Sequence, residues 1–296
     1  MLAEAPIRLY LHAPRKVQHG QFPWGVVFLF IAVFSHSRTY SVVLFVSDMH
    51  FGRADRHTTR CDEQALVDCL RAHYDTTQYL YLVGDVFDAY IEHQKYVPKG
   101  AVRLQAELAR WVESGRSVIY LMGNHDPWHL DYMDRELGVR MIDGPWIAHH
   151  FGQQVYLAHG DAIASTHGWF GRWMRTVMRH KGAVAAYRTL IPADWGLAGA
   201  ERVSRWLHGP TDPQVVNALG IHAQHVLHAS NASAVVMGHS HQPVLQSYKD
   251  GVYANTGAWY ETRTVVRFTG TRWTLMRWNG KRAVPIKSVH LHRSAC

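Results

Sequence analysis

Five short motifs of aspartate, asparagine and histidine residues recur along the sequence, and their side chains could bind metal ions. The motifs are Ser47-Asp48-Met49-His50, Gly84-Asp85-Val86-Phe87-Asp88, Gly123-Asn124-His125-Asp126, His159-Gly160-Asp161 and Gly238-His239-Ser240-His241. Their carboxylate, imidazole and amide groups form a hard-to-borderline ligand set, and none of the motifs contains cysteine. Such a set suits Mn²⁺, Fe or Zn²⁺ better than a metal that prefers thiolates.

The expected metal ligands are Asp48, His50, Asp85, Asn124, His159, His239 and His241. They are too many for one tetrahedral metal, but they suffice for two metals that share one carboxylate and keep open positions for water. Asp85 is the expected bridge because it follows a central strand. Two metals about 3.5–4 Å apart can hold a hydroxide between them and clamp a phosphoryl group for in-line attack. We therefore expect two divalent metal ions as cofactors, with Mn²⁺ favoured and Fe or Zn²⁺ as alternatives.

The other polar residues of the motifs are expected to assist these metals. Asp88 and Asp126 are interpreted as hydrogen-bond acceptors that orient ligand or catalytic imidazoles. His125 remains as a proton donor or charge stabiliser for the leaving oxygen, so that His125 and Asp126 are the expected catalytic residues. The glycines that precede three of the ligands are expected to let the backbone turn sharply at these points.

Each motif begins where a short apolar run stops, which indicates how the chain could bring the motifs together. The runs cover residues 42–46, 79–83, 118–122, 155–158 and 234–237 and are interpreted as buried strands. Helical patterns alternate with the first strands, one of them from Asp62 to Tyr74 after a polar loop over 53–60, and this alternation favours parallel pairing. In an open α/β sheet, binding sites form at the edge where the carboxyl ends of the strands lie. We therefore expect all five motifs to meet at one sheet edge.

The segment from residue 162 to residue 210 differs in composition from the rest of the chain. It contains seven Lys or Arg residues against two acidic ones, and it is rich in tryptophan. We interpret it as a helical insertion, or cap, that stands over the site. Arg172, Arg175, Arg179 and Lys181 are candidates for contact with a substrate phosphate or with a membrane, and solvated surface charge is the alternative for each.

The composition is that of a globular chain that favours acidic partners. Of its 296 residues, 47% are hydrophobic and 18% are charged, and the net charge is +8. This balance excludes a disordered chain and favours phosphates, nucleic acid or an anionic membrane face as partners. The three cysteines form no CxxC pair, which indicates a reducing compartment.

Residues 1–38 are interpreted as an N-terminal extension, disordered or interfacial, before a single domain over 39–296. An apolar stretch over 22–34 follows Arg15, Lys16 and His19, but it is shorter than the roughly 20 residues that span a bilayer. A secretory signal, an interfacial anchor and an upstream extension from a misplaced start are the alternatives, and we favour the latter two.

The ordered motifs D-x-H, GDxxD, GNHD, HGD and GHSH resemble those of the calcineurin-like metallophosphoesterase superfamily over about residues 41–260. This resemblance implies an α/β fold, a four-layer α/β/β/α sandwich with both metals at the sheet edges. It also implies that Asp48, His50, Asp85 and His241 bind one metal, while Asp85, Asn124, His159 and His239 bind the other.

The sequence around three motifs is more specific. The runs Tyr81–Asp88, Met122–Trp128 and Glu136–Val139, with the basic insertion, resemble the bacterial UDP-2,3-diacylglucosamine diphosphatase-like branch. That branch implies cleavage of UDP-2,3-diacylglucosamine, a lipidated nucleotide sugar of lipid A synthesis, into UMP and the acylated sugar 1-phosphate. Amphipathic helices with Trp and Arg could hold the acyl chains and rest on an anionic bilayer. We therefore expect a cytoplasmic protein at the inner membrane surface, with no nucleic acid partner.

Two alternatives remain open. The best-known members of that branch carry arginine where this chain has His125, which brings the motif closer to general phosphoesterases. The substrate could therefore be a soluble nucleotide, another phosphodiester or a nucleic-acid end. A non-catalytic scaffold of the same fold is the third hypothesis, and the presence of all the expected ligands speaks against it. The oligomeric state does not follow from the sequence.

Overall fold

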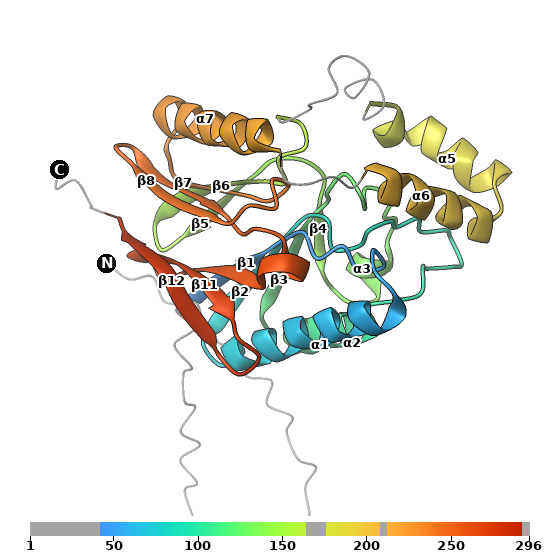
Figure 1. The fold of residues 1–296 in the computed structure, drawn as a ribbon, viewed down its shortest axis with the longest axis horizontal. Helices are drawn as coiled ribbons and strands as arrows, with labels where there is room; N and C mark the ends of the chain where they lie inside the picture. The colour runs from blue at the N-terminus through green and yellow to red at the C-terminus, as the bar shows by residue number, and fades with distance from the viewer. Residues whose placement is uncertain (1–41, 164–175, 208–211, 292–296) are drawn as a thin grey trace, which may run out of the picture. The chain divides into compact units, whose positions relative to one another are not determined.

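The computed structural model describes residues 42–163, 176–207 and 212–291. The predicted extension over 1–38 and two candidate residues of the cap, Arg172 and Arg175, lie outside these ranges. Within them, no helix is both long enough and apolar enough to cross a membrane. The residues in these ranges belong to one compact unit, which is shown in Figure 1.

Two β-sheets form the centre of this unit. The strands of the first are β1 (Val42–Val46), β2 (Thr77–Val83), β3 (Ser117–Leu121), β4 (Arg140–Ile142), β10 (Thr264–Phe268), β11 (Arg272–Trp278) and β12 (Ala283–His290). The strands of the second are β5 (Trp146–His150), β6 (Gln153–Ala158), β7 (Ala232–Met237), β8 (Val244–Tyr248) and β9 (Gly251–Asn255). The first sheet has the order β12-β11-β10-β1-β2-β3-β4, with β1 to β4 parallel. The second has the order β5-β6-β7-β9-β8, with β6, β7 and β9 parallel.

Helices cover the outer faces of both sheets. The described helices are α1 (Arg56–His73), α2 (Val102–Glu113), α3 (Tyr132–Arg135), α5 (Lys181–Leu190), α6 (Ala193–Leu207), α7 (Pro213–Ala229) and α8 (Trp259–Thr262). The helices α1 and α2 pack against the first sheet, and α7 packs against the second (Figure 1). This succession of helix, sheet, sheet and helix confirms the predicted four-layer α/β/β/α sandwich.

Side chains that point alternately to the two faces of each strand explain how the apolar core is divided into layers. Within β1, Leu44 and Val46 belong to the core layer that contains the apolar side chains of α1 and α2. Val43 and Phe45 belong to the layer between the sheets, together with side chains of β6 and β7. Successive side chains of a strand lie on opposite faces of its sheet. A continuous apolar run such as the one in β1 therefore predicts a strand that is buried on both faces.

The helix α1 begins at Arg56 and not at Asp62, so the polar loop predicted over 53–60 is largely wrong. The side chain of Asp55 accepts hydrogen bonds from two N–H groups of the first turn, at 2.8 and 3.1 Å. A cap of this kind typically stabilises a helix by about 1 kcal/mol. Asp62 lies inside the helix, where its carboxylate pairs with Arg263 at 3.1 Å.

The five motifs follow strands of both sheets, whereas the strand pattern alone predicted the edge of a single sheet. The resemblance to the metallophosphoesterases had implied the edges of a sandwich, as observed. β1, β2 and β3 lead into the first three motifs, and β6 and β7 of the second sheet lead into the last two. The two sets meet, because the main-chain N–H of His239 donates to both carboxylate oxygens of Asp48 at 3.1 Å. The carboxyl ends of the five strands therefore lie together across the junction of the two sheets.

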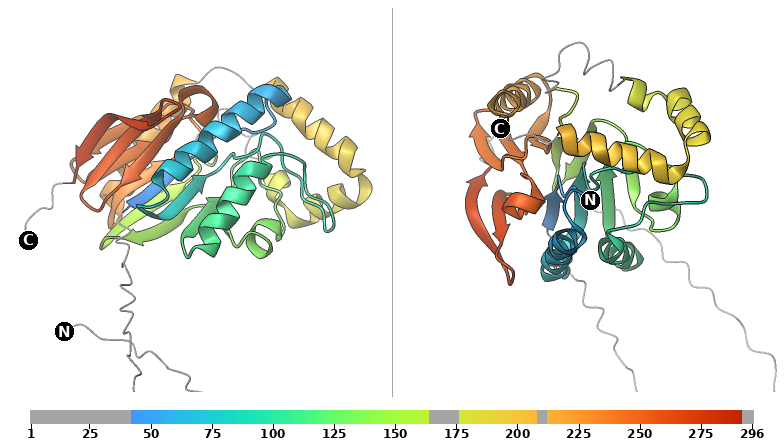
Figure 2. Two further views of the ribbon diagram at one scale, coloured as in Figure 1. Left: turned by 90° about the horizontal axis from the view of Figure 1, so that it is seen from below. Right: turned by 45° about the vertical axis from the view of Figure 1, so that its right-hand side comes forward.

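The segment predicted to form a cap contains α5 and α6 in its described part, and both helices stand beside the sandwich (Figure 2). They connect the fourth motif, after β6, to α7. Their function as a cover for bound substrate stays a prediction.

Candidate active site

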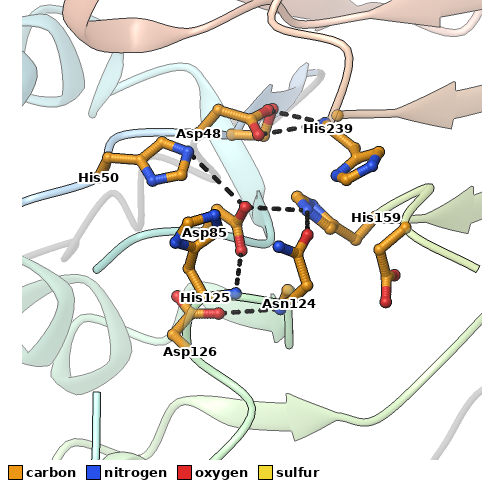
Figure 3. Close-up of polar contacts among 12 residues, drawn as sticks. Asp48, His50, Asp85, Asn124, His125, Asp126, His159 and His239 are labelled. Atoms are coloured by element: carbon orange, nitrogen blue, oxygen red, sulfur yellow. Dashed lines mark hydrogen bonds and ion pairs between the residues drawn. The ribbon is translucent and has the colours of Figure 1, made fainter. Parts of the chain in front are cut away.

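Among the described residues, polar side chains of the five motifs converge into three groups that could each hold a metal ion (Figure 3). One of them, His50 with Asp88 and His125, shares His50 with another group, and the other two consist of expected ligands. The first group contains Asp48, His50 and His241, and the second contains Asp85, His159 and His239. The donor atoms within each group lie within 4.8 Å of one another. Asn124 joins the second group, because its side-chain oxygen lies 3.1 Å from Nε2 of His159. The structure thus brings all the expected ligands together.

Asp85 lies between the two groups. Its Oδ2 atom is 3.1 Å from Nε2 of His159, which belongs to the second group. The same atom is 3.6 Å from Nε2 of His50, which belongs to the first. The other carboxylate oxygen accepts the main-chain N–H of His125 at 2.9 Å, and this bond orients the carboxylate. A carboxylate in this position can bridge two cations.

Three of the imidazoles are held so that Nε2 faces the centre of the site. Their Nδ1 atoms have partners outside the centre. Nδ1 of His159 lies 2.9 Å from the main-chain oxygen of Val83, and Nδ1 of His50 lies 3.3 Å from the Asp88 carboxylate. Nδ1 of His241 lies 3.2 Å from the Tyr260 hydroxyl. The Val83 carbonyl and the Asp88 carboxylate can only accept and so keep a proton on Nδ1, whereas the Tyr260 hydroxyl orients the His241 ring and can accept from it in the same way. The Nε2 lone pairs are therefore available to a cation.

Burial and ion pairing set the charge of the candidate ligands. Burial lowers the pKa of His239 to about 4 and that of His241 to about 3, so both imidazoles are neutral at pH 7. Burial also opposes charge on His159, but the Asp85 carboxylate raises the pKa of this imidazole well above its ordinary value. A divalent cation between them would displace the proton, as metal binding generally does. The donor set of carboxylates, imidazoles and one amide oxygen fits two divalent cations.

The backbone of the site is strained at most of the ligands. Asp48, His50, Asp85, His239 and His241 have φ angles between 47° and 66°, in the left-handed region. Residues other than glycine adopt this conformation at a cost of about 1 kcal/mol each. Such strain persists only where the surrounding structure enforces it, and it concentrates at functional sites.

Three glycines of the motifs leave room for ligands that belong to other motifs. A Cβ atom would collide with the Asp85 carboxylate if placed on Gly123, with the His159 ring if placed on Gly84, and with the Asp48 carboxylate if placed on Gly238. Sharp backbone turns were the predicted reason for these glycines, but of the three only Gly84 has a positive φ, at 87°. Close approach of a neighbouring ligand explains the other two.

His125 lies beside the first group of ligands. Its ring stands edge-on to the ring of His50, with 4.6 Å between the ring centres. Its Nδ1 atom lies 3.0 Å from the main-chain oxygen of Asp88 and 3.1 Å from the hydroxyl of Ser204 in α6. An imidazole at this position is suited to proton transfer next to the metals.

The contacts of Asp126 differ from the prediction that this residue orients an imidazole. Its buried carboxylate accepts the main-chain N–H groups of Val86 at 2.7 Å, Phe87 at 3.2 Å and Gly123 at 2.9 Å, as well as the hydroxyl of Tyr120. These bonds tie the second motif to the third. Asp126 therefore positions the loops that carry Asp85 and Asn124.

A comparison with protein families agrees with this arrangement. The sequence model of the family described as calcineurin-like phosphoesterase matches residues 41–243, which is more than half of the chain. The chain belongs to this family. It is accordingly a metal-dependent phosphohydrolase, and the two groups of expected ligands could hold metal ions.

Curated proteins similar to this phosphohydrolase carry the name UDP-2,3-diacylglucosamine hydrolase. The one from Porphyromonas gingivalis is 31% identical over 121 residues, which are 41% of this chain and 46% of that protein. The one from Vibrio vulnificus is 23% identical over 239 residues, which are 78% of this chain and 96% of that protein. The one from Stenotrophomonas maltophilia is 25% identical over 246 residues, with the same two coverages of 78% and 96%. The match thus spans less than half of the first relative and nearly all of the other two.

The candidate substrate-binding residues of this phosphohydrolase are described only in part. Arg172, Arg175 and the side chain of Lys181 lie outside the described structure, although Lys181 begins α5. The guanidinium group of Arg179 contacts the carboxylate of Asp143, the carboxylate of Asp161 at 3.6 Å and the main-chain oxygen of Gly123 at 3.3 Å. Arg179 therefore links the segment before α5 to the third motif.

Two residues beside the first group of ligands were not singled out from the sequence. Tyr260, in α8, faces His241 through its hydroxyl, and the guanidinium of Arg53 lies over the Tyr260 ring, 3.8 Å from its centre. The main chain brings α8 to this place, because the N–H of Trp259 donates to the main-chain oxygen of Asp48 at 3.0 Å. No local pattern marks Arg53 or Tyr260, since the contact joins the first motif to a segment far along the chain.

Proposed function

We propose that this phosphohydrolase cleaves the diphosphate of UDP-2,3-diacylglucosamine and releases UMP and 2,3-diacylglucosamine 1-phosphate. The observation that carries the proposal is the position of Asp85 between two groups of ligands, which suits a pair of cations acting on one phosphoryl group. The choice of substrate is supported by the relatives named UDP-2,3-diacylglucosamine hydrolase, two of which match over 96% of their length.

The residues of the two groups would hold the metals. Asp48, His50, Asp85 and His241 would bind one cation, and Asp85, Asn124, His159 and His239 would bind the other. Divalent cations, with Mn²⁺ favoured over Fe or Zn²⁺, would polarise the phosphoryl group and activate water as a nucleophile. The surrounding residues keep the ligands in place, because they fix the imidazole tautomers and join the loops of the second and third motifs.

His125 is the proposed proton donor. The main-chain oxygen of Asp88 can only accept, so Nδ1 of His125 carries a proton. As the proton donor, the ring carries a second proton on Nε2, and this is the proton that passes to the departing oxygen. Water adds to the phosphorus on the uridine side, the bond from this phosphorus to the bridging oxygen breaks, and the sugar phosphate leaves. Protonation of the departing oxygen assists this step, and such catalysis typically contributes about 10²–10⁴-fold.

The helical segment, as we call the predicted cap over residues 162–210 that contains α5 and α6, is proposed to receive the acyl chains. It is also proposed to rest on the anionic inner membrane from the cytoplasmic side. At the turn from α5 to α6, Leu190 and Trp195 are 78% and 77% exposed. Exposed apolar side chains close to basic ones are typical of helices that lie on an anionic bilayer. Arg172, Arg175 and Lys181 are the proposed charged contacts.

A phosphoesterase that acts on a soluble nucleotide, another phosphodiester or a nucleic-acid end is the second candidate. His125 favours it, because the best-known relatives of the lipid branch carry arginine at this position. Both candidates share the chemistry of the site and differ only in what the helical segment must accommodate.

The test measures UMP release from UDP-2,3-diacylglucosamine by the full chain reconstituted with Mn²⁺, beside a panel of soluble phosphodiesters. Asp85→Ala should abolish turnover, with a loss well beyond the about 10–100-fold typical of an outer partner of a metal ligand. Asp250→Ala, which removes a carboxylate paired with His228 in the β8–β9 turn, is the matched control and should leave turnover unchanged. Preference for the soluble esters would favour the second candidate, and a chain that binds no transition metal would favour a non-catalytic scaffold.

A further inference from the structure

A residue of the helical segment reaches the proposed proton donor. Ser204 lies in α6 and is only 5% exposed, although α6 stands outside the sandwich. Its Oγ atom lies 3.1 Å from Nδ1 of His125. The hydroxyl also hydrogen-bonds the carboxylate of Asp88. Ser204 therefore bridges the two residues of the phosphoesterase core that stand behind the reacting centre.

The direction of these hydrogen bonds follows from the partners. Nδ1 of His125 is 3.0 Å from the main-chain oxygen of Asp88, which has no proton to give, so Nδ1 is a donor. The Ser204 oxygen can accept from the same N–H, and its own proton is then directed to the Asp88 carboxylate. A hydroxyl can do both at once, whereas an apolar side chain can do neither. The arrangement keeps Nδ1 protonated and holds the ring in one orientation, so that Nε2 is the nitrogen that exchanges a proton with the substrate.

The helical segment is anchored to the loop that carries His125 at further points. The guanidinium of Arg188 in α5 donates to the main-chain oxygen of Trp128 at 2.7 Å. The indole N–H of Trp128 donates to the main-chain oxygen of Met178 at 2.6 Å, and its ring packs edge-on against Tyr187 with centres 4.8 Å apart. The position of Ser204 relative to His125 is therefore set by a docked segment and not by one isolated contact.

We propose that Ser204 is a positioning residue for His125, through which the helical segment completes the proton-donating side of the site. The inference rests on the proposed role of His125 in phosphoester hydrolysis, and it does not depend on the lipid substrate. It assigns the segment a task in the chemical step in addition to binding.

The kinetic test compares two diesters of UMP that differ only in the leaving group, phenyl and p-nitrophenyl, with the Mn²⁺-loaded full chain. Nitrophenolate leaves readily without a proton, whereas phenolate needs one. Ser204→Ala should lower kcat about 10-fold more for the phenyl ester than for the nitrophenyl ester, with KM changed less than about 2-fold. Ser204→Thr keeps the hydroxyl and should restore the phenyl reaction. Val203→Ala, which shortens an exposed neighbour on α6, is the control for disturbance of the helix.

A second readout is independent of turnover. In the chain with ¹⁵N-labelled histidine, the wild-type His125 ring should show a protonated Nδ1, and Ser204→Ala should shift its nitrogen signals while those of His159 stay in place. His125→Gln identifies the signals. Unchanged His125 signals, or an equal loss of kcat for both esters, would overturn the role of Ser204. Failure of the lipid substrate in a chain that still hydrolyses the UMP esters would instead count against the proposed function alone.

Discussion

The hydroxyl group of Tyr260 lies 3.2 Å from Nδ1 of His241. The other ring nitrogen of His241 faces the Asp48 carboxylate at 3.5 Å, so Tyr260 contacts the side of the imidazole that points away from the site. Outer partners of this kind hold a metal-binding imidazole in one orientation and raise its basicity. Tyr260 should therefore control how tightly the first group binds its cation.

Replacement of Tyr260 by phenylalanine removes this partner and keeps the ring under Arg53. We expect a metal affinity about 10–100-fold lower for the first group, with little change for the second. Calorimetric titration of the metal-free protein with Mn²⁺ resolves the two sites. Tyr248→Phe, which alters a tyrosine at the end of β8, is the control. Equal affinities for Tyr260→Phe and the parent chain would contradict the assignment.

Gly123→Ala tests the close approach of Asp85 to the third motif. The added Cβ would collide with the carboxylate and lie 2.5 Å from the main-chain nitrogen of Asp85, so the bridge must shift. Because a 1 Å misplacement can cost about 100-fold in rate, we expect at least this loss in UMP release. Gly199→Ala in α6, where a Cβ meets nothing within 4 Å, should leave the rate unchanged. Circular dichroism checks that both variants fold, and full activity of Gly123→Ala would refute the geometry.

Metal removal should destabilise the fold, because cations neutralise buried carboxylates such as Asp48, whose pKa burial raises to about 7. A ligand at about 100 times its Kd stabilises by about 2.7 kcal/mol, which corresponds to about 5–10 °C in Tm for a domain of this size. Dialysis against a chelator should lower Tm by this amount, and Mn²⁺ should restore it. Asp85→Asn should show no such response. A Tm that is insensitive to metal in the parent chain would argue against a preformed site.

A buried histidine outside the metal groups should make the protein sensitive to acid. Burial, with a smaller effect of Arg188, lowers the pKa of His129 from 6.5 to about 3. Between these pH values the unfolded chain binds a proton that the folded chain excludes, so stability falls as the pH decreases through this window. The neutral His129 should therefore lower the free energy of unfolding by about 2 kcal/mol at pH 5 and by nothing above pH 7.

His129→Phe should remove that dependence and keep the ring stacked on Tyr90, whose centre lies 4.1 Å away. Urea unfolding at pH 5 and pH 8 measures the difference, and the variant should lose less stability than the parent chain between the two. His225→Gln, at an exposed position of α7, is the control. An identical pH dependence in parent and His129→Phe would show that the imidazole is not held neutral.

The motifs could be predicted from the sequence because each depends on a short stretch of chain. An apolar run that ends in Asp or His reveals the strand and the ligand together, and the run over 42–46 coincides with β1. The chemistry of the ligands followed from residue types alone. The division of the strands between two sheets did not follow from residue types, because strands that pair, such as β1 and β10, lie at opposite ends of the chain.

What the sequence could not reveal depends on contacts between distant segments. Ser204 and Tyr260 touch imidazoles of the site from α6 and α8, and nothing in their neighbourhoods marks them. Arg179 was predicted to be a candidate for contact with a phosphate, and its guanidinium contacts the carboxylate of Asp143, 36 residues earlier. The carboxylate of Asp126 likewise accepts hydrogen bonds from main-chain N–H groups, because the loops of two motifs bring these groups close to one another.

The left-handed backbone at five of the ligands has a consequence for any attempt to transplant this chemistry. Each such residue would relax to an extended or helical conformation in a short peptide, and the combined penalty is a sizeable part of the about 5–15 kcal/mol by which an ordinary domain is stable. Peptides that copy the motifs, or a smaller scaffold that displays them, would scatter the side chains. The hydrolytic centre is in this sense a property of the entire sandwich, whose packing holds the ligands where they would not remain by themselves.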